Sequence, residues 1–404
     1  MVQSPEETNQ TIVTEFVLLG FQASKNVRTF IFSLLFVVYC GTICGNLLII
    51  TLVSTSKNLH TPMYFFISQL AISDIVLPTD IVPNMFYMLL NNGGEITYTG
   101  CITQLYFFSV SEGLECLLLT VMSYDRYVAI CNPLHYISIM TNPYCVKLVM
   151  ICWLASLSMT LTYDTQVSML LFCGQNIIDH FFCDILPLLE ISCSDTSIVR
   201  QQIYLLSIPL IITPTIIIII SYTKIISSIL RIPSTTGRQK AFSTCSSHLI
   251  VVSIFYWTIF CVYILATKGK SSTIGKIPSL LYIVFTPMIN PIVYSLKNKD
   301  IMKAIRDTIK KIWCYLNAQI GRFGISDEGI CWWASSVPEL ESEERRLLNP
   351  SVPIRHFRSD ECVSEPTWNA EQSNSRDAGS QRSSDIFKQP IGTYEEKVVN
   401  CEGI

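Results

Sequence analysis

The sequence predicts an all-α membrane protein, a seven-transmembrane helix bundle with a short amphipathic helix on the inner membrane surface and a disordered C-terminal tail. Three observations support this fold class. Half of the 404 residues are hydrophobic and only 15% are charged, whereas soluble domains carry about 25% charged residues. The apolar residues form seven runs, each near the roughly 20 residues that a helix needs to cross a membrane. From Asn317 onward the chain is polar with little apolar patterning, as in disordered segments.

Charge and composition exclude some partners. The formal net charge is only −3, the mean hydropathy is +0.41, and the sequence has no basic block of the kind that binds nucleic acid. We therefore expect a membrane environment and no nucleic-acid partner.

The segment before the first apolar run, residues 1–28, is expected to be an extracellular N-terminus. It lacks the basic and apolar regions of a signal peptide, so the first span is expected to act as an uncleaved signal anchor. Asn9-Gln10-Thr11 is a glycosylation sequon, and Asn9 would be used if this segment lies outside the cell.

The seven apolar runs each predict one membrane-spanning helix. Prolines interrupt the second, fifth and seventh runs, and membrane helices tolerate such kinks where neighbouring helices satisfy the freed carbonyls. The predicted spans are Thr29–Val53, Pro62–Leu90, Ile102–Ile130, Cys145–Thr165, Gln202–Ile226, Phe242–Leu265 and Ile277–Leu296.

Basic residues in the short loops predict the orientation of the bundle. They gather after the fifth span, at Arg231 and Arg238, and after the seventh, from Lys297 to Lys311. Because cytoplasmic loops carry the excess of Lys and Arg, the pattern favours an N-terminus outside the cell and a C-terminus in the cytosol.

Four cysteines are expected on the outer face. Cys173, Cys183 and Cys193 lie in the long loop after the fourth span, and Cys101 lies at the outer end of the third. Such a group indicates a disulfide framework formed in an oxidising compartment, for which the sequence alone allows three pairings. Cross-links of this kind would hold the loop over the bundle as a lid.

The chain beyond the last span predicts two further regions. Apolar residues recur at helical spacing among basic ones from Lys297 to about Trp313, which favours an amphipathic helix on the inner membrane surface. The membrane-spanning region with its amphipathic helix would thus cover residues 29–313, and a cytoplasmic disordered tail would cover residues 314–404. This tail is either a regulatory segment or the product of an incorrectly predicted gene end.

Charged residues inside the spans indicate function, because each costs about 2.5–3.5 kcal/mol at mid-bilayer. Asp74 and Glu115 fall at similar depth in two antiparallel spans. Two neighbouring carboxylates rarely both ionise unless they share a cation. The pair therefore predicts either a bound sodium ion or shared proton, or simply a hydrogen-bonded structural pair. Arg126 lies at the inner end of its span beside Asp125 and Tyr127, where an ion pair could form and be released as a switch.

Five stretches of the sequence resemble one family. They are LHTPMYFFISQLAISD, MSYDRYVAICNPLHY, HFFCDILPLLEISCSDT, KAFSTCSSHL and PMINPIVYSLKNK. Together they are similar to olfactory (odorant) receptors of the rhodopsin-like G-protein-coupled class, and the resemblance covers about residues 16–312.

The resemblance implies roles for individual residues. Cys101 would be bonded to Cys183, and Cys173 to Cys193. The residues implied to form the switch that meets the G protein are Asp125, Arg126, Tyr127, Tyr222, Asn290, Pro291 and Tyr294. Tyr256 would form the floor of the odorant pocket. Trp257 departs from the glycine common at its position in the family, and its bulk is expected to alter packing in the sixth span.

Pocket residues are predicted from depth and family position. Glu112 is outside the usual family pattern and lies one turn from Glu115. It would contact ligand and favour cationic or hydrogen-bond-donating odorants; the alternative is a neutral or internally bonded glutamate. The other predicted ligand contacts are Phe108, Ser109, Ile203, Leu206, Ser207, Tyr256, Ile259, Phe260, Tyr263, Leu280 and Ile283.

The resemblance implies a receptor in the plasma membrane and not an enzyme. A small organic odorant would bind from outside, and a stimulatory olfactory-type G protein would raise cyclic AMP; apart from the sodium ion or proton, no cofactor is expected. A transporter would be expected to show internal repeats and a channel a filter or charged ring, and the sequence shows neither. A receptor tuned to a metabolite outside the nose remains an alternative.

Overall fold

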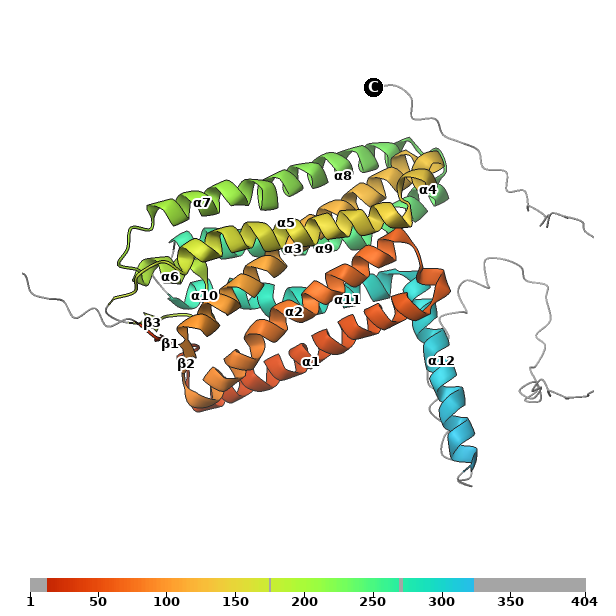
Figure 1. Cartoon of the computed structure of the whole chain (residues 1–404). Helices are drawn as coiled ribbons and strands as arrows, with labels where there is room; N and C mark the ends of the chain where they lie inside the picture. Colours follow the sequence, from red (N-terminus) through yellow and green to blue (C-terminus); the bar gives the residue numbers. More distant parts are fainter. Residues whose placement is uncertain (1–12, 174–175, 269–271, 323–404) are drawn as a thin grey trace, which may run out of the picture. The chain divides into compact units, whose positions relative to one another are not determined.

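The computed structural model describes residues 13–173, 176–268 and 272–322. Within these residues seven segments are long and apolar enough to cross a membrane, which confirms the predicted bundle (Figure 1). They are α1 (Lys25–Thr55), α2 (Pro62–Asn91), α3 (Tyr98–Cys131), α5 (Asn142–Val167), α7 to α8 (Ser197–Arg231), the apolar part of α9 (Thr235–Lys268) and α10 to α11 (Ser272–Lys297). Short helices η1 (Lys57–Leu59), η2 (Pro133–His135) and α4 (Tyr136–Ile139) lie between the spans.

Helix α3 is a central element of the bundle. In the most apolar stretch of α3, 61% of residues are buried, whereas the corresponding figure is 17% for the segment from α7 to α8. The large apolar side chains on the outer surface of α7 and α8, such as Ile219 and Ile220, are about half exposed. Such a surface suits lipid chains rather than water.

Glycine permits two close approaches between helices. A Cβ atom on Gly45 of α1 would lie 3.2 Å from Pro291 of α11, and one on Gly113 of α3 would lie 2.9 Å from the Ser156 Oγ of α5. Small residues at such crossings let helix backbones pack closely in membranes. Ser156 also donates a hydrogen bond of 2.7 Å to the Val110 carbonyl, which ties α5 to α3.

The fifth and seventh spans each contain a π-helical turn close to a proline: Pro209 lies in the first turn, and Pro287 shortly follows the second. The fifth span is built from α7 (Ser197–Ser207), the π-turn η3 (Ile208–Ile212) and α8 (Thr213–Arg231); the seventh is built from α10 (Ser272–Leu280), the π-turn η4 (Leu281–Phe285) and α11 (Thr286–Lys297). Pro291 cannot donate a backbone hydrogen bond to the Pro287 carbonyl. Asn46 Nδ2 supplies that bond instead, at 3.1 Å.

A small sheet, which the sequence does not predict, lies at the end of the bundle that carries Cys101. Its order is β2 (Gly94–Thr97), β1 (Glu15–Leu18), β3 (Ile177–Ile178), with β1 antiparallel to β2 and parallel to β3. Phe16 and Leu18 of β1 are almost fully buried. The segment before the first span is thus the central strand of a sheet. We call this end of the bundle the Cys101 end and the opposite end the Arg126 end.

The amphipathic helix is longer than predicted. Helix α12 runs from Lys299 to Arg322, so residues 314–322 are helical and the predicted boundary at Trp313 is wrong. Ile301 and Ala304 of α12 are buried, whereas Lys303 and Arg306 are exposed. The predicted disordered tail beyond this helix and the Asn9 sequon lie outside the described residues.

Candidate functional site

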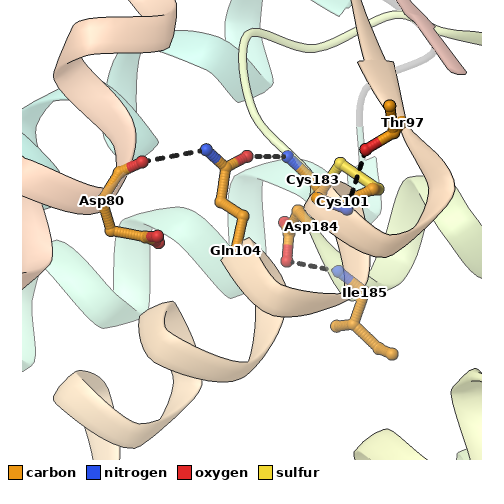
Figure 2. The surroundings of a disulfide bond; sticks show 8 residues. Asp80, Thr97, Cys101, Gln104, Cys183, Asp184 and Ile185 are labelled. Atoms are coloured by element: carbon orange, nitrogen blue, oxygen red, sulfur yellow. Dashed lines mark hydrogen bonds between the residues drawn. A yellow bond between two sulfur atoms is a disulfide. The ribbon is translucent and has the colours of Figure 1, made fainter.

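Two disulfides fix the loop between α5 and α7 at the Cys101 end. We call the described residues of this loop, 168–173 and 176–196, the roof. The disulfides join Cys101 to Cys183 and Cys173 to Cys193, which are the pairings that the family resemblance implies. Gln104 of α3 adds a polar link: its side chain donates to the Asp80 carbonyl and accepts from the Cys183 backbone N–H at 3.0 Å (Figure 2). The loop segment around Cys183 is therefore fixed to α3 and, through Gln104, to α2.

A second contact ties the roof to the last span. The Lys276 ammonium of α10 lies 2.6 Å from the Asp179 carboxylate and 2.8 Å from the Gly20 carbonyl. His180, next to Asp179, packs against the rings of Phe181 and Phe182. Burial, with a smaller contribution from Lys276, lowers the pKa of His180 to about 3. The imidazole is therefore neutral at physiological pH.

Beneath this roof lies a cavity of about 310 Å³, close to the lower limit of about 300 Å³ for small-molecule pockets. It is bounded by α3, the end of α5, the start of α6 (Ile185–Ile191), the segment from α7 to η3, and α9. Most of its lining is apolar. The lining residues are Phe108, Ser109, Glu112, Gly113, Thr160, Tyr163, Asp184, Ile185, Ile203, Tyr204, Leu206, Ser207, Leu210, Ile211, Ile212 and Ile259.

Seven of the predicted ligand contacts line this cavity. They are Phe108, Ser109, Glu112, Ile203, Leu206, Ser207 and Ile259. The polar lining residues that sequence reasoning missed are Thr160, Tyr163, Asp184 and Tyr204. Asp184 directly follows a disulfide cysteine and caps α6 by accepting a 2.7 Å hydrogen bond from the Ile185 N–H. Burial raises the pKa of its carboxyl to about 6, although the Ile185 bond opposes that shift.

Four predicted pocket residues do not line the cavity. Phe260 follows Ile259 by one position, about 100° around the helix, so it points outward, is 52% exposed and stacks on Trp257. Trp257 is itself 66% exposed, so its bulk lies on the outer surface of the span. The other three residues outside the lining are Tyr256, Leu280 and Ile283.

None of the described residues of the seventh span lines the cavity, and the position of Phe108 explains this. The Phe108 ring lies 6.1 Å from Tyr282 of η4 and 5.0 Å from Phe182 of the roof, measured between ring centroids. Phe108 therefore separates the cavity from the side on which Leu280 and Ile283 lie. The side chain of Tyr263 lies outside the described part of the structure.

The predicted acidic pair lies deeper, in the interior between α2, α3 and α11. Asp74 and Glu115 are each 2% exposed. Asn290 of α11 donates to both Asp74 oxygens at 3.0 Å, and Ser73 contacts the Ser111 carbonyl one turn from Glu115. Among the described residues, Glu115 Oε1 has no hydrogen-bond partner.

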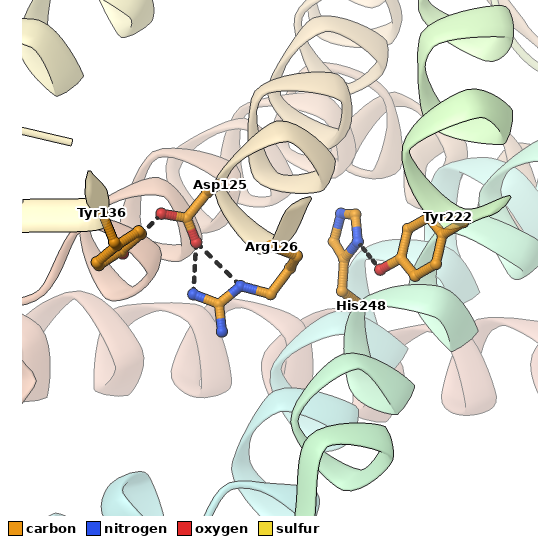
Figure 3. Close-up of polar contacts among 5 residues, drawn as sticks. All are labelled: Asp125, Arg126, Tyr136, Tyr222 and His248. Atoms are coloured by element: carbon orange, nitrogen blue, oxygen red, sulfur yellow. Dashed lines mark hydrogen bonds and ion pairs between the residues drawn. The ribbon is translucent and has the colours of Figure 1, made fainter. Parts of the chain in front are cut away.

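At the Arg126 end the arginine is paired. The Arg126 guanidinium forms an ion pair with Asp125, and Tyr136 donates a 2.8 Å hydrogen bond to the other Asp125 oxygen (Figure 3). Asp125 is fully buried. Burial, and next the Asp125 charge, raise the pKa of Tyr136 above its usual value, so its hydroxyl keeps the proton that it donates. Tyr127 lies on another face, with the Lys224 ammonium 5.8 Å from its ring centroid.

The family resemblance implies that Tyr222 of the fifth span is the partner of Tyr294 in the seventh, and the structure gives the two tyrosines different surroundings. Tyr222 of α8 is hydrogen-bonded to His248 Nδ1 of α9 at 2.5 Å (Figure 3). Tyr294 is buried, and its hydroxyl has no hydrogen-bond partner within the described residues. The sequence contained a signal for His248, because it lies in the KAFSTCSSHL stretch used above only for the family resemblance.

The bundle has the fold of rhodopsin-like receptors. Squid rhodopsin superimposes with a TM-score of 0.57 over 72% of this chain and 88% of that chain, at 17% sequence identity. This similarity concerns the fold alone.

The sequence comparisons then give the family. The olfactory receptor family model matches residues 32–314. Olfactory receptor 1496 of Rattus norvegicus is 45% identical over 74% of this chain and 96% of its own length. Olfactory receptor 5G3 of Homo sapiens is 43% identical over 76% of this chain and 98% of its own. The chain belongs to the olfactory receptor family, and is thus a multi-pass membrane receptor rather than an enzyme.

Proposed function

We propose that this chain is an odorant receptor of the plasma membrane with the Cys101 end outside the cell. Two disulfides at that end suit an oxidising compartment, and the basic residues Arg231 and Arg238 fall at the opposite end. A small organic odorant enters the cavity beneath the disulfide-linked roof. An epitope tag at the N-terminus should be stained on unpermeabilised cells, and a tag that needs permeabilisation would contradict this orientation.

One observation carries the signalling proposal: a single buried helix, α3, lines the cavity with Phe108 and Glu112 and carries the Asp125–Arg126 ion pair at its other end. An odorant that binds better to a second conformation shifts the population toward it, by no more than its differential affinity. Release of Arg126 in that conformation opens a docking site for a stimulatory olfactory-type G protein, which raises cyclic AMP.

The test is a cyclic-AMP response panel of odorants in cells that express the chain. The Arg126→Ala variant should reach the cell surface but lose the response, because the G protein needs the released guanidinium. An odorant response that persists in that variant would contradict the mechanism. Expression in tissue outside the nose, with metabolites active in the same panel, would instead favour a metabolite receptor.

We also propose that Asp74 and Glu115 share one cation, a sodium ion or a proton. The fit is chemical: hard cations prefer oxygen ligands, and Glu115 offers a buried oxygen without a hydrogen-bond partner among the described residues. Asp74 and Glu115 would hold the ion, which would neutralise one of two buried negative charges. Replacing sodium chloride with choline chloride should lower the thermal stability of the purified receptor if sodium is bound. An unchanged stability would favour the proton.

A further inference from the structure

The polar groups of the cavity are unbalanced in charge. Glu112 and Asp184 both line it, whereas its lining contains no Lys, Arg or His. Glu115, almost fully buried one turn from Glu112 on α3, adds a carboxyl group on the inner side. Glu112 and Asp184 are partly buried, and carboxylates that are partly removed from water attract nearby cations. An anionic ligand would meet repulsion from this lining, and an ammonium ion would be attracted.

Thr160 gives a second, independent indication of a polar ligand. This residue of α5 lines the cavity, is 0% exposed, and its hydroxyl has no hydrogen-bond partner among the described residues. A buried hydroxyl without a partner is costly, so a ligand that offers an N–H donor would satisfy it. Close packing of α5 on α3 at Gly113 and Ser156 places Thr160 one turn beyond Ser156, on the side of the cavity.

The rest of the lining selects a hydrophobic body for the ligand. Leu206, Leu210, Ile211 and Ile259 line the cavity together with the rings of Phe108 and Tyr163. Aromatic rings of this kind also attract cations over their faces. A molecule that matches all of these groups has one ammonium head and a compact apolar body.

On the basis of the proposed function, we infer that the cavity binds lipophilic amines as ammonium cations. The Glu112 carboxylate pairs with the ammonium group, and the Thr160 hydroxyl oxygen accepts a hydrogen bond from one of its N–H groups. Asp184 attracts the cation from the roof. Aliphatic amines ionise near the pKa of lysine, about 10.4, so they carry a full charge at neutral pH.

The experiment compares amines with alcohols of the same shape. The pairs are hexylamine and 1-hexanol, cyclohexylamine and cyclohexanol, and 2-phenylethylamine and 2-phenylethanol. In cells expressing the full chain, we expect at least one amine to raise cyclic AMP at concentrations at least tenfold lower than its alcohol, because a charged partner makes the stronger hydrogen bond.

Three variants assign the effect to residues. Glu112→Gln should raise the half-maximal concentration of the amine at least tenfold and change that of the alcohol by less than about twofold. Thr160→Val should raise the half-maximal concentration of the amine roughly threefold to fivefold, because one hydrogen bond is lost. Glu190→Gln is the matched control: Glu190 is exposed on α6 and does not line the cavity, and this variant should respond like the wild type. Surface staining checks that every variant folds.

The amine site and the signalling mechanism can fail separately. If neutral odorants activate and the amines do not, or if Glu112→Gln shifts amine and alcohol equally, the amine site is wrong and the receptor function stands. If no compound raises cyclic AMP, the thermal stability of purified receptor is measured with each pair. Stabilisation of the wild type by an amine, lost in Glu112→Gln, supports the site although signalling has failed. Equal stabilisation of both proteins, or none, overturns it.

Discussion

The Cys101 end and the Arg126 end of the bundle are held together by different kinds of contact. At the Cys101 end two disulfides, a three-stranded sheet and the Lys276–Asp179 ion pair join segments from distant parts of the sequence. At the Arg126 end the described polar contacts between side chains are ion pairs and hydrogen bonds, such as those of Asp125 with Arg126 and of Tyr222 with His248. Covalent bonds do not exchange on the timescale of signalling, whereas ion pairs and hydrogen bonds do.

This difference indicates where motion is permitted. A ligand can change a protein only between states that it binds with different affinity. A fixed roof keeps the cavity formed, so the free energy of ligand binding is not consumed in ordering the loop. The exchangeable pairs at the other end then provide the alternative arrangements. The predictions below test this contrast, from the largest expected effect to the smallest.

The largest effect is expected from opening the roof. Cys101→Ser or Cys183→Ser should reduce receptor at the cell surface by roughly tenfold or more, because loss of a native disulfide typically costs about 2–5 kcal/mol. Flow cytometry of an N-terminally tagged receptor measures this. The matched control is Cys261→Ser, which removes a free cysteine of α9 and should leave surface receptor unchanged. Normal surface levels in both roof variants would show that the sheet and the Lys276 contact suffice.

Breaking the ion pair at the Arg126 end should change signalling and not the amount of receptor at the cell surface. Asp125→Asn should leave surface expression intact and raise ligand-independent cyclic AMP roughly tenfold, because hydrogen bonds to charged groups contribute about 1.5–3 kcal/mol and stabilise only the paired state. The measurement is basal cyclic AMP normalised to surface receptor. A basal level equal to that of the wild type would mean that the pair does not restrain signalling.

Acidification tests the roof through His180. The pKa of His180 is about 3 in the folded chain and about 6.5 in the unfolded chain. Between about pH 3 and about pH 6.5 the imidazole therefore binds a proton in the unfolded state and not in the folded state. Stability is therefore lost as the pH falls below about 6.5, by up to about 2 kcal/mol at pH 5. His180→Phe should remove this loss, as measured by thermal unfolding of the purified receptor at pH 7.5 and 5.0.

Asp184 changes the pH dependence of stability in the opposite direction to His180. Variants of both residues must therefore be compared. The pKa of Asp184 is raised to about 6 in the folded chain, so between about 3.9 and that value the folded state binds more protons and gains stability as the pH falls. Asp184→Asn should steepen the acid destabilisation of the wild type, whereas His180→Phe should flatten it. Identical slopes in all three proteins would contradict both assignments.

The smallest effect is expected from removing a single hydroxyl at the Arg126 end. Tyr136→Phe deletes the hydrogen bond to Asp125 while the ion pair remains, a loss of about 1 kcal/mol. Basal cyclic AMP should rise up to about fivefold, less than in Asp125→Asn. The variant Tyr87→Phe is the control, because Tyr87 is exposed near the Cys101 end of α2, far from Asp125. A larger increase in Tyr136→Phe than in Asp125→Asn would reverse the proposed order of the two contacts.

Much of the fold could be predicted because the length of an apolar span is a strong, local signal. The spans fit seven long helices because a bilayer requires about 20 apolar residues in a run. Strands β1 to β3 contain only two to four residues each, which is too short to show the alternation by which a strand is recognised. The sheet is formed by partners far apart in sequence, and no local pattern records such pairing.

Cavity residues could be predicted where depth along the span alone determines whether a side chain lines the cavity. They could not be predicted where rotation about the helix axis determines it. Depth placed Phe108, Glu112 and Leu206 level with the cavity that they line. Phe260 has a suitable depth but faces away, since one residue turns a helix by about 100°. Asp184 and Thr160 belong to a loop and to a helix end, and their places in the cavity follow from the disulfide at Cys183 and from the packing at Gly113.

The π-helical turns η3 and η4 have a consequence for how such a bundle can diversify. Each accommodates one residue more than an α-helical turn, at Pro209 in the fifth span and shortly before Pro287 in the seventh. The part of the helix toward the Cys101 end is therefore offset in rotation from the part toward the Arg126 end. A deletion within either turn would rotate one half while leaving the other in place. In the fifth span, which lines the cavity, the face presented to ligand and the face presented to the signalling partner can thus be selected separately along one continuous helix.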